Sequence, residues 1–358
     1  MADDHASKAI SCYGPGINNM PNLDRIANDD MIFHHCYVTN SICTPSRATV
    51  LTGMHNHVNE VLTLDSKTNN RLPNVAKALR VGGYQIAMIG NGHLGEGEDH
   101  EPNGFDYWSV SMERVPGYAT DVIMDKSLDW IKLRIRTSHS SSCVITRRLT
   151  IAGNATANAR AAKVARIRVA EDLTYFDLGL AQPDGGSRVG NMMDKPSVQD
   201  RKIPTIHDGK PLKRIYEEHN TAFTFSNNGE LAEFKFQRYM QRYLRTAQSI
   251  DDNVCRILDF LNGEGLAENT IVIYTSDQGF FLGEHGCFDK RFMYEESFQM
   301  PFLIRYPKEI KSGSVCNELI SNVDFAPTFF EFATQQRPTF MQGYSFRSLL
   351  QGRTPSDW

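Results

Sequence analysis

Short apolar runs that alternate with longer amphipathic segments constrain the fold of this chain more than any other feature. The apolar runs predict strands, and they lie at residues 31–37, 84–89, 270–274 and 302–306. The segments with helical spacing lie at residues 21–29, 72–81, 120–131, 231–261 and 324–332, with Thr120 as the expected N-cap of its helix. This alternation is typical of an α/β fold, and we predict a mostly parallel sheet flanked by helices.

Length and composition favour one large globular domain. A chain of 358 residues suits a single α/β unit, which we assign to residues 1–358, and the hydrophobic share of 41% is ordinary for a globular protein. The net charge of −4, without a basic run among aromatic residues, argues against nucleic acid as a partner. No apolar run approaches the roughly eighteen residues of a membrane span. The seven cysteines show neither CxxC pairs nor a disulfide framework.

The pentapeptide CTPSR at residues 43–47, followed by LTG at 51–53, carries the strongest functional signal. It resembles the signature of the type I sulfatases, formylglycine-dependent enzymes of the alkaline phosphatase superfamily. In that family a formylglycine-generating enzyme oxidises the motif cysteine to an aldehyde, and the hydrate of the aldehyde is the nucleophile. The resemblance implies that Cys43 becomes this formylglycine. It also implies that Arg47 holds the sulfate with its planar guanidinium group.

Two acidic segments resemble the metal-binding segments of the same family. The pentapeptide MADDH at residues 1–5 looks like the aspartate pair that ends the family's first strand. The pentapeptide TSDQG at 275–279 follows a predicted strand, so it lies at the carboxyl edge where open α/β sheets bind ligands. Carboxylate and amide oxygens suit Ca²⁺, with Mg²⁺ as the alternative, rather than zinc. The implied ligands are Asp3, Asp4, Cys43, Asp277 and Gln278.

Two further residues take roles from the resemblance. The segment FDKRFMYEESFQMP at 288–301 resembles the family's lysine segment, which implies that Lys290 contacts the sulfate. The loop GNGHLG at 90–95 follows a predicted strand, and His93 matches the family histidine that helps the sulfated diol to collapse. The family usually has lysine and tryptophan before that histidine. Asn91 therefore removes one charged contact to the sulfate.

The resemblance extends over residues 1–131 and 171–358 and is strongest to the bacterial N-acetylglucosamine-6-sulfatase branch. It implies a sulfated carbohydrate substrate, with 6-O-sulfo-N-acetylglucosamine as the expected sugar. Family members are often periplasmic or secreted. No signal peptide is visible in this chain, and its compartment is not predicted.

Residues 133–168 do not fit the rest of the chain. The segment holds no Phe, Tyr or Trp, whereas the whole chain is 10% aromatic, and it is rich in Ser, Arg, Ala and Thr. One interpretation is a disordered basic loop. We favour another, in which the segment is translated out of frame, because a shifted reading of plausible codons yields a strand and a family-like lysine and histidine. We therefore expect 133–168 to be an aberrant, poorly packed segment without the pattern of a buried strand.

Both ends of the chain look short against the family. Residue 1 falls at the end of the family's first strand, and residue 358 falls before its smaller C-terminal subdomain. We therefore expect an alkaline-phosphatase-like and sulfatase-like fold that lacks the first strand and the C-terminal subdomain.

Two other functions stay open beside sulfate ester hydrolysis. The change at Asn91, the segment 133–168 and the short ends favour an inactive or weakly active remnant that at most binds sulfate or a glycan. A phosphodiesterase or phosphonate hydrolase of the same superfamily is the second alternative. Such enzymes often use Thr or Ser as the nucleophile and two metals held by several His and Asp residues, so the CTPSR motif argues against them.

Overall fold

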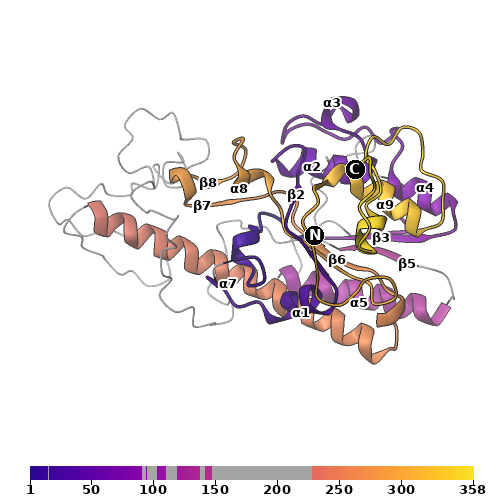
Figure 1. The fold of residues 1–358 in the computed structure, drawn as a ribbon, viewed down its shortest axis with the longest axis horizontal. Coiled ribbons are helices and arrows are strands. Elements are labelled where there is room, and N and C mark those ends of the chain that lie inside the picture. Colours follow the sequence, from indigo (N-terminus) through magenta and orange to yellow (C-terminus); the bar gives the residue numbers. More distant parts are fainter. Residues whose placement is uncertain (15, 91–93, 95–102, 110–118, 138–141, 147–227) are drawn as a thin grey trace.

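The computed structural model describes residues 1–14, 16–90, 94, 103–109, 119–137, 142–146 and 228–358 (Figure 1). Its strands are β1 (Met31–Phe33), β2 (Cys36–Tyr37), β3 (Gln85–Ile89), β4 (Tyr107–Ser109), β5 (Ser142–Thr146), β6 (Val272–Thr275), β7 (Phe281–Leu282), β8 (Phe288–Asp289), β9 (Phe302–Arg305), β10 (Ser314–Cys316) and β11 (Ile320–Ser321). Its α-helices are α1 (Pro21–Asp29), α2 (Cys43–Thr52), α3 (Asn56–Asn59), α4 (Val75–Val81), α5 (Ala119–Thr137), α7 (Asn228–Gly263), α8 (Glu295–Phe298), α9 (Phe325–Phe332) and α10 (Arg347–Leu350). Short 3₁₀ turns lie at Ser7–Ala9, Ala267–Asn269, Glu284–Gly286 and Asn322–Asp324.

The described strands form two larger sheets and two small ribbons. The four-stranded sheet has the order β10-β1-β9-β6, and the three-stranded sheet has the order β4-β3-β5. All pairs of the three-stranded sheet are parallel, as the sequence predicts. The four-stranded sheet is mixed, because β9 is antiparallel to both β1 and β6.

The direction of β9 follows from the path of the chain between β6 and β9. The chain leaves the carboxyl end of β6, forms the β7–β8 hairpin beyond that edge and returns through α8. Because the chain re-enters the sheet at the same end of the strands from which it left, β9 must run antiparallel to β6. The intervening hairpin and turn bring residue 290 close to the carboxyl end of β6.

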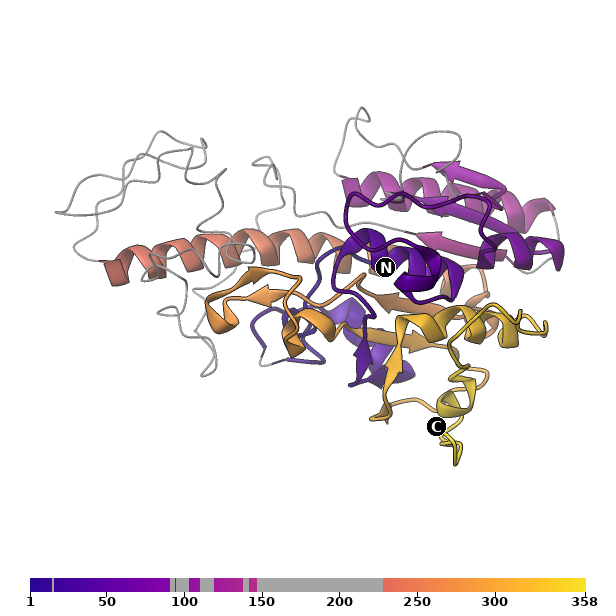
Figure 2. The same cartoon turned by 90° about the horizontal axis from the view of Figure 1, so that it is seen from above.

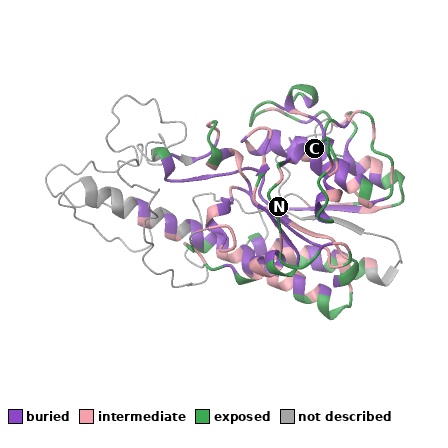
Figure 3. Cartoon of the chain, viewed as in Figure 1, coloured by how far each residue is buried: buried purple, intermediate pink, exposed green. Residues whose placement is uncertain are grey.

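Helices cover the sheets on both faces, because successive strand residues point to opposite faces and every residue of β1 and β9 is buried. In β1, Ile32 packs into a core with α1 and α7, whereas Met31 and Phe33 face a second core with α9 and α10. A third core joins α2, α4 and α9 to β3, and α5 covers the other face of β3. Figure 3 shows the resulting pattern of buried strands between partly exposed helices.

Helix α7, the longest of the described helices, packs against both α1 and strand β6. Its buried Asp251 accepts hydrogen bonds from the backbone N–H groups of Asn22, at 3.0 Å, and Leu23, at 2.8 Å, at the start of α1. A carboxylate in this place satisfies donors that a helix N-terminus leaves unpaired. Figures 1 and 2 show α7 extending past the sheets on the side where the β7–β8 hairpin lies. Among the described helices, none has the length and apolar character needed to cross a membrane.

Several predicted boundaries shift for local reasons. The strand predicted at 31–37 is two strands, because β1 pairs with β9 and β10 whereas β2 pairs with β11. The helix predicted from residue 72 begins at Val75, since the Asn74 side chain accepts a hydrogen bond from the N–H of Lys77 at 2.9 Å and caps it. Thr120 is not an N-cap: α5 begins at Ala119, and the Thr120 hydroxyl donates to the Ser249 hydroxyl at 3.2 Å.

The expectation that 133–168 lacks strand structure is wrong for residues 142–146. Helix α5 continues to Thr137, and β5 follows and pairs with β3 in parallel over five residue pairs. The run Cys143-Val144-Ile145 is apolar and partly β-branched, which is sufficient for a short strand. The remaining residues of the segment, 138–141 and 147–168, lie outside the described residues.

Candidate active site

The site is built at the carboxyl end of β6. The N-terminal residues lie beside this strand end, where Ala2 forms a parallel bridge with Ser276. The Ala2 N–H donates to the Thr275 carbonyl at 2.7 Å, and the Asp277 N–H donates to the Ala2 carbonyl at 3.0 Å. These bonds place Asp3 and Asp4 against Asp277, although the two segments are far apart in the sequence.

Helix α2 supplies the residues of the CTPSR motif. Cys43 is its first residue, and the helix ends where Gly53 adopts the left-handed conformation, with φ of 66° and ψ of 22°. Arg47 lies one turn after Cys43, on the same side of the helix. Its Nη2 atom lies 2.7 Å from Asp277 Oδ2 and its Nε atom 3.1 Å from the same oxygen, and Nη2 also contacts Asp3. The motif arginine therefore lies among the acidic residues.

Lys290 brings a second cationic side chain to the site. It follows β8, and its Nζ atom donates to Cys43 Sγ at 2.8 Å and forms an ion pair with Asp4 Oδ1. The Gln278 side-chain amide also donates to Asp4 Oδ1. The structure thus brings together seven of the predicted site residues, which are Asp3, Asp4, Cys43, Arg47, Asp277, Gln278 and Lys290. His93 and Asn91 lie outside the described residues.

Burial makes the electrostatics of this cluster strong. The exposed fractions of Asp3, Arg47, Asp277 and Lys290 are 2%, 2%, 0% and 5%. Burial, reinforced by the charges of Asp277 and Asp4, raises the pKa of the Cys43 thiol well above its ordinary value. Burial lowers the pKa of Lys290, but the charges around it, Asp4 first, outweigh this effect and raise it. Lys290 is therefore a cation, and the unmodified Cys43 thiol is protonated and a poor nucleophile.

The donor set fits a hard divalent cation. Asp3, Cys43 and Asp277 offer ligand atoms that all lie within 4.8 Å of one another. Gln278 is fully buried, and its Oε1 atom has no hydrogen-bond partner among the described residues. A buried carbonyl oxygen without a donor is costly unless a cation or water meets it. Carboxylate and amide oxygens suit Ca²⁺ or Mg²⁺ rather than zinc.

The backbone around the site adopts unusual conformations. Asp4, Asp289 and Arg291 have φ values of 56°, 83° and 95°, in the region that usually favours glycine. Two of these residues flank Lys290. Non-glycine residues in this region cost free energy, and they persist where the surrounding contacts determine the backbone. The lysine is thus presented by a strained turn.

Several residues that support the site carry no distinguishing signal in the sequence. Tyr243 of α7 donates its hydroxyl to the Asp4 carbonyl at 2.8 Å and accepts the Ala6 N–H at 2.8 Å. His5 is fully buried, its Nδ1 atom lies 2.5 Å from the Tyr274 hydroxyl oxygen, and burial lowers its pKa to about 3, so it is neutral. An aromatic residue on the apolar face of a helix has the same sequence pattern as a core residue, so Tyr243 carried no distinguishing signal.

Known proteins resemble this chain in sequence. The sulfatase family model matches residues 1–145, and the model of the C-terminal region of N-sulphoglucosamine sulphohydrolase matches residues 283–358. The N-acetylglucosamine-6-O-sulfatase of Bacteroides thetaiotaomicron is 37% identical, in an alignment that covers 100% of this chain and 71% of that protein. The N-acetylglucosamine-6-sulfatase of Capra hircus is 27% identical, in an alignment that covers 92% of this chain and 59% of that protein.

Solved structures also resemble this chain. The structure of BT4656 in complex with its substrate D-glucosamine-2-N,6-O-disulfate matches with a TM-score of 0.75 and 33% identity, over 100% of this chain and 81% of that one. The phosphonate monoester hydrolase of Silicibacter pomeroyi matches with a TM-score of 0.72 over 100% of this chain and 77% of that one, but at 18% identity it shows the fold alone. The fold and the buried acidic site define a hydrolase of anionic esters. The chain belongs to the sulfatase family, whose reaction is the hydrolysis of sulfate esters.

Proposed function

We propose that this chain removes the 6-O-sulfate of N-acetylglucosamine in a sulfated glycan, using formylglycine formed from Cys43. The observation that carries the proposal is the contact of Lys290 Nζ with Cys43 Sγ, at 2.8 Å, beside the buried carboxylates of Asp3 and Asp277. A cationic side chain and an acidic metal-ligand set beside one oxidisable side chain suit an anionic sulfate ester. The choice of sugar is supported by the N-acetylglucosamine-6-sulfatases among the relatives.

The nucleophile requires modification of Cys43. The raised pKa keeps the thiol protonated, and a protonated thiol attacks an anionic ester poorly. Formylglycine in its hydrated form supplies a hydroxyl for attack on sulfur and a second hydroxyl that later expels sulfate. A formylglycine-generating enzyme is therefore a required maturation partner.

Asp3, Asp4, Asp277 and Gln278 would hold the cation beside residue 43. When bound, a divalent cation lowers the pKa of a hydroxyl group at the site. Ca²⁺ is the proposed ion and Mg²⁺ the alternative, because the donors are carboxylate and amide oxygens. These four side chains would fix where the cation binds.

Arg47 and Lys290 supply positive charge for the transferred sulfuryl group. Both are almost fully buried, so their charges act in a medium of low dielectric constant on the charge that develops during attack. His93 is proposed to help the sulfated diol collapse, on the basis of the loop sequence at 90–95. Arg47 also neutralises the carboxylate of Asp277, so it links the sulfate-binding and metal-binding parts of the site.

Sulfate release from two defined sugars tests the proposal. Protein co-expressed with a formylglycine-generating enzyme is incubated with N-acetylglucosamine-6-sulfate and with D-glucosamine-2-N,6-O-disulfate. We expect release of the 6-O-sulfate from both and retention of the N-sulfate. Release of the N-sulfate alone, or hydrolysis of a phosphonate monoester in preference to both sugars, would overturn the proposed substrate.

A second candidate is a weakly active form of the same enzyme. Asn91 stands where the family usually has a lysine, and residues 133–168 have a composition unlike the rest of the chain. Loss of a charged contact and of a proton donor for the leaving alcohol would together cost orders of magnitude in rate. Resequencing codons 130–172 and comparing this chain with an Asn91→Lys, frame-restored chain tests this candidate. Equal activity of the two proteins would contradict it.

A further inference from the structure

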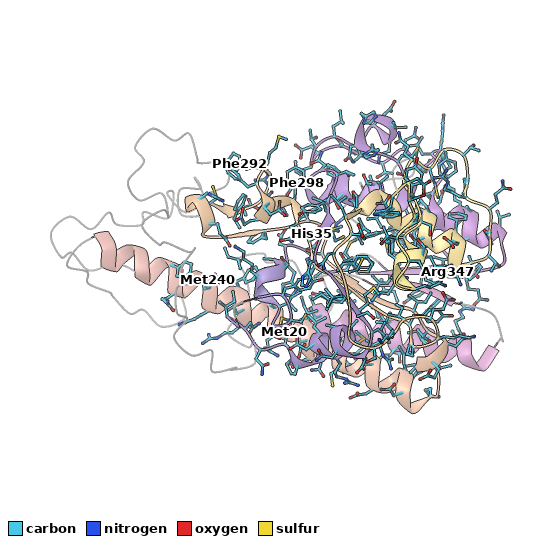
Figure 4. The ribbon with its side chains drawn as sticks, in the orientation of Figure 1. Met20, His35, Met240, Phe292, Phe298 and Arg347 are labelled. Atoms are coloured by element: carbon cyan, nitrogen blue, oxygen red, sulfur yellow. The ribbon has the colours of Figure 1, made fainter. Side chains whose placement is uncertain are left out.

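Ser297 lies where three site-bearing segments of the chain meet. It belongs to α8, is fully buried, and lies in the segment that Phe292 and Phe298 mark in Figure 4. Its Oγ atom accepts the N–H of Arg291 at 3.0 Å and lies 2.6 Å from Ser41 Oγ. Its carbonyl oxygen accepts the Ser41 hydroxyl at 2.7 Å and the Gly279 N–H at 3.0 Å.

These bonds have one assignment that uses every hydroxyl hydrogen. The Arg291 N–H donates to Ser297 Oγ, the Ser297 hydroxyl donates to Ser41 Oγ, and the Ser41 hydroxyl donates to the Ser297 carbonyl. Ser41 is only 2% exposed, so water does not readily replace these partners. A closed set of buried hydrogen bonds fixes the relative position of its members more firmly than isolated bonds do.

Each partner of Ser297 adjoins a residue of the active site. Arg291 follows Lys290, Gly279 follows Gln278, and Ser41 lies two positions before Cys43. The segments are also packed closely, since a Cβ atom on Gly279 would lie 2.3 Å from the Glu296 carbonyl oxygen. The connection therefore joins the segments that carry the nucleophile, the cation ligands and the lysine.

The hydrogen bonds of Ser297 stabilise the strained turn at residues 289–291. Asp289 and Arg291 hold φ values of 83° and 95° on either side of Lys290, and such a turn needs external contacts to keep its shape. The Arg291 N–H, held by Ser297, is one of these contacts. We propose that Ser297 is a positioning residue that sets the Lys290 ammonium against the group derived from Cys43. The proposal rests on the proposed function for its kinetic readout.

Hydrogen exchange and a double-mutant cycle test the proposal in the formylglycine-containing, Ca²⁺-loaded protein. Ser297→Ala removes the acceptor of the Arg291 N–H, so exchange in a peptide covering residues 287–293 should quicken about five- to tenfold. Ser41→Ala breaks the same connection from the other side and should have a similar effect. The matched control is Ser127→Ala, because Ser127 is fully buried and donates to Ile123 of its own helix at 2.7 Å. It should leave that peptide unchanged.

The kinetic arm separates positioning from general stability. Ser297→Ala should lower kcat/KM about 10- to 100-fold when Lys290 is present, because small misplacements of a reacting group are costly. In a Lys290→Ala background the same change should cost less than about threefold, since there is no ammonium left to position. Unchanged exchange in 287–293, or an equal loss in both backgrounds, would overturn the proposal. If the unaltered protein releases no sulfate, the proposed function fails, and the exchange result still decides the role of Ser297.

Discussion

The Nζ atom of Lys290 lies 2.8 Å from the Sγ atom of Cys43, although the two residues are 247 positions apart in the chain. The lysine comes from the turn after β8, and the cysteine is the first residue of α2. Both are buried, so a charge on the lysine acts strongly on a group at position 43. The sequence assigns both residues to one site through the family resemblance, and the structure brings them into contact.

Removal of the lysine charge should damage catalysis more than folding. Lys290→Ala should lower kcat about 10²- to 10³-fold, the effect of removing one charged donor from a developing anion. Lys308→Ala is the control, because it removes the same charge from an exposed position. Steady-state sulfate release and a thermal melt of each variant measure the two effects. A loss below tenfold in a folded Lys290→Ala protein would remove Lys290 from the catalytic site.

Calcium should stabilise the protein through Asp277. Binding at a concentration of about one hundred times the Kd adds about 2.7 kcal/mol to the free energy of unfolding, and a chelator should reverse it. Asp277→Asn should abolish most of this gain, whereas Asp129→Asn, at an exposed position of α5, should retain it. Thermal melts with Ca²⁺, Mg²⁺ or chelator measure the gain. An undiminished calcium shift in Asp277→Asn would place the ion elsewhere.

Tyr243 should affect cation affinity without touching the ion. Its hydroxyl fixes the backbone of Asp4 and Ala6, and outer residues that orient metal ligands typically contribute 10- to 100-fold in affinity. We expect Tyr243→Phe to raise the Kd for calcium about tenfold, with little change at saturating calcium. Tyr306→Phe is the control, since Tyr306 packs against Phe332 in another core. Calorimetric titration of both variants with calcium distinguishes a raised Kd in Tyr243→Phe from a general loss of stability.

Asp30 should give the stability a defined pH dependence. It is fully buried 3.6 Å from Arg305 Nε, and burial, opposed by Arg305, raises its pKa from 3.8 to about 6. The folded state therefore binds this proton more tightly than the unfolded state, so stability falls as pH rises from about 4 to 6. Relative to this protein, Asp30→Asn should gain stability over that window, by no more than about 1.4 kcal/mol per pH unit, and then level off. Denaturant unfolding at several pH values measures the difference, and a difference that is flat with pH would contradict the raised pKa.

Local patterns predicted those parts of the fold for which one segment carried the whole signal. The helix at 21–29 has the predicted bounds, because Pro21 at its start and the buried Leu23 and Ile26 are local features. The direction of β9 was not predictable, because it depends on the path of the chain through residues 276–301. The split of 31–37 was also hidden, since it depends on pairing with β10 and β11.

The residues that support the site could not be predicted either, because their roles depend on contacts between segments that are far apart in the sequence. Ser297 lies in the segment that resembles the family, but its hydroxyl acts only through Arg291, Ser41 and Gly279, which three-dimensional folding brings together. Asp4 was predicted as a ligand, whereas its left-handed backbone, with φ of 56°, is visible only in the structure. The sequence motifs thus indicated the candidate catalytic and metal-binding residues, but not the contacts that position them.

We propose that residue 43, once converted to formylglycine, is the nucleophile of a sulfatase. The most direct test combines the mass of the peptide that contains residue 43 with sulfate release by the same sample, after co-expression with a formylglycine-generating enzyme. We expect this peptide to be about 18 Da lighter than its cysteine form. We also expect sulfate release from N-acetylglucosamine-6-sulfate in proportion to the converted fraction, and none from Cys43→Ala. Unconverted Cys43 beside other converted CxPxR proteins, or equal sulfate release by Cys43→Ala, would contradict this role of residue 43.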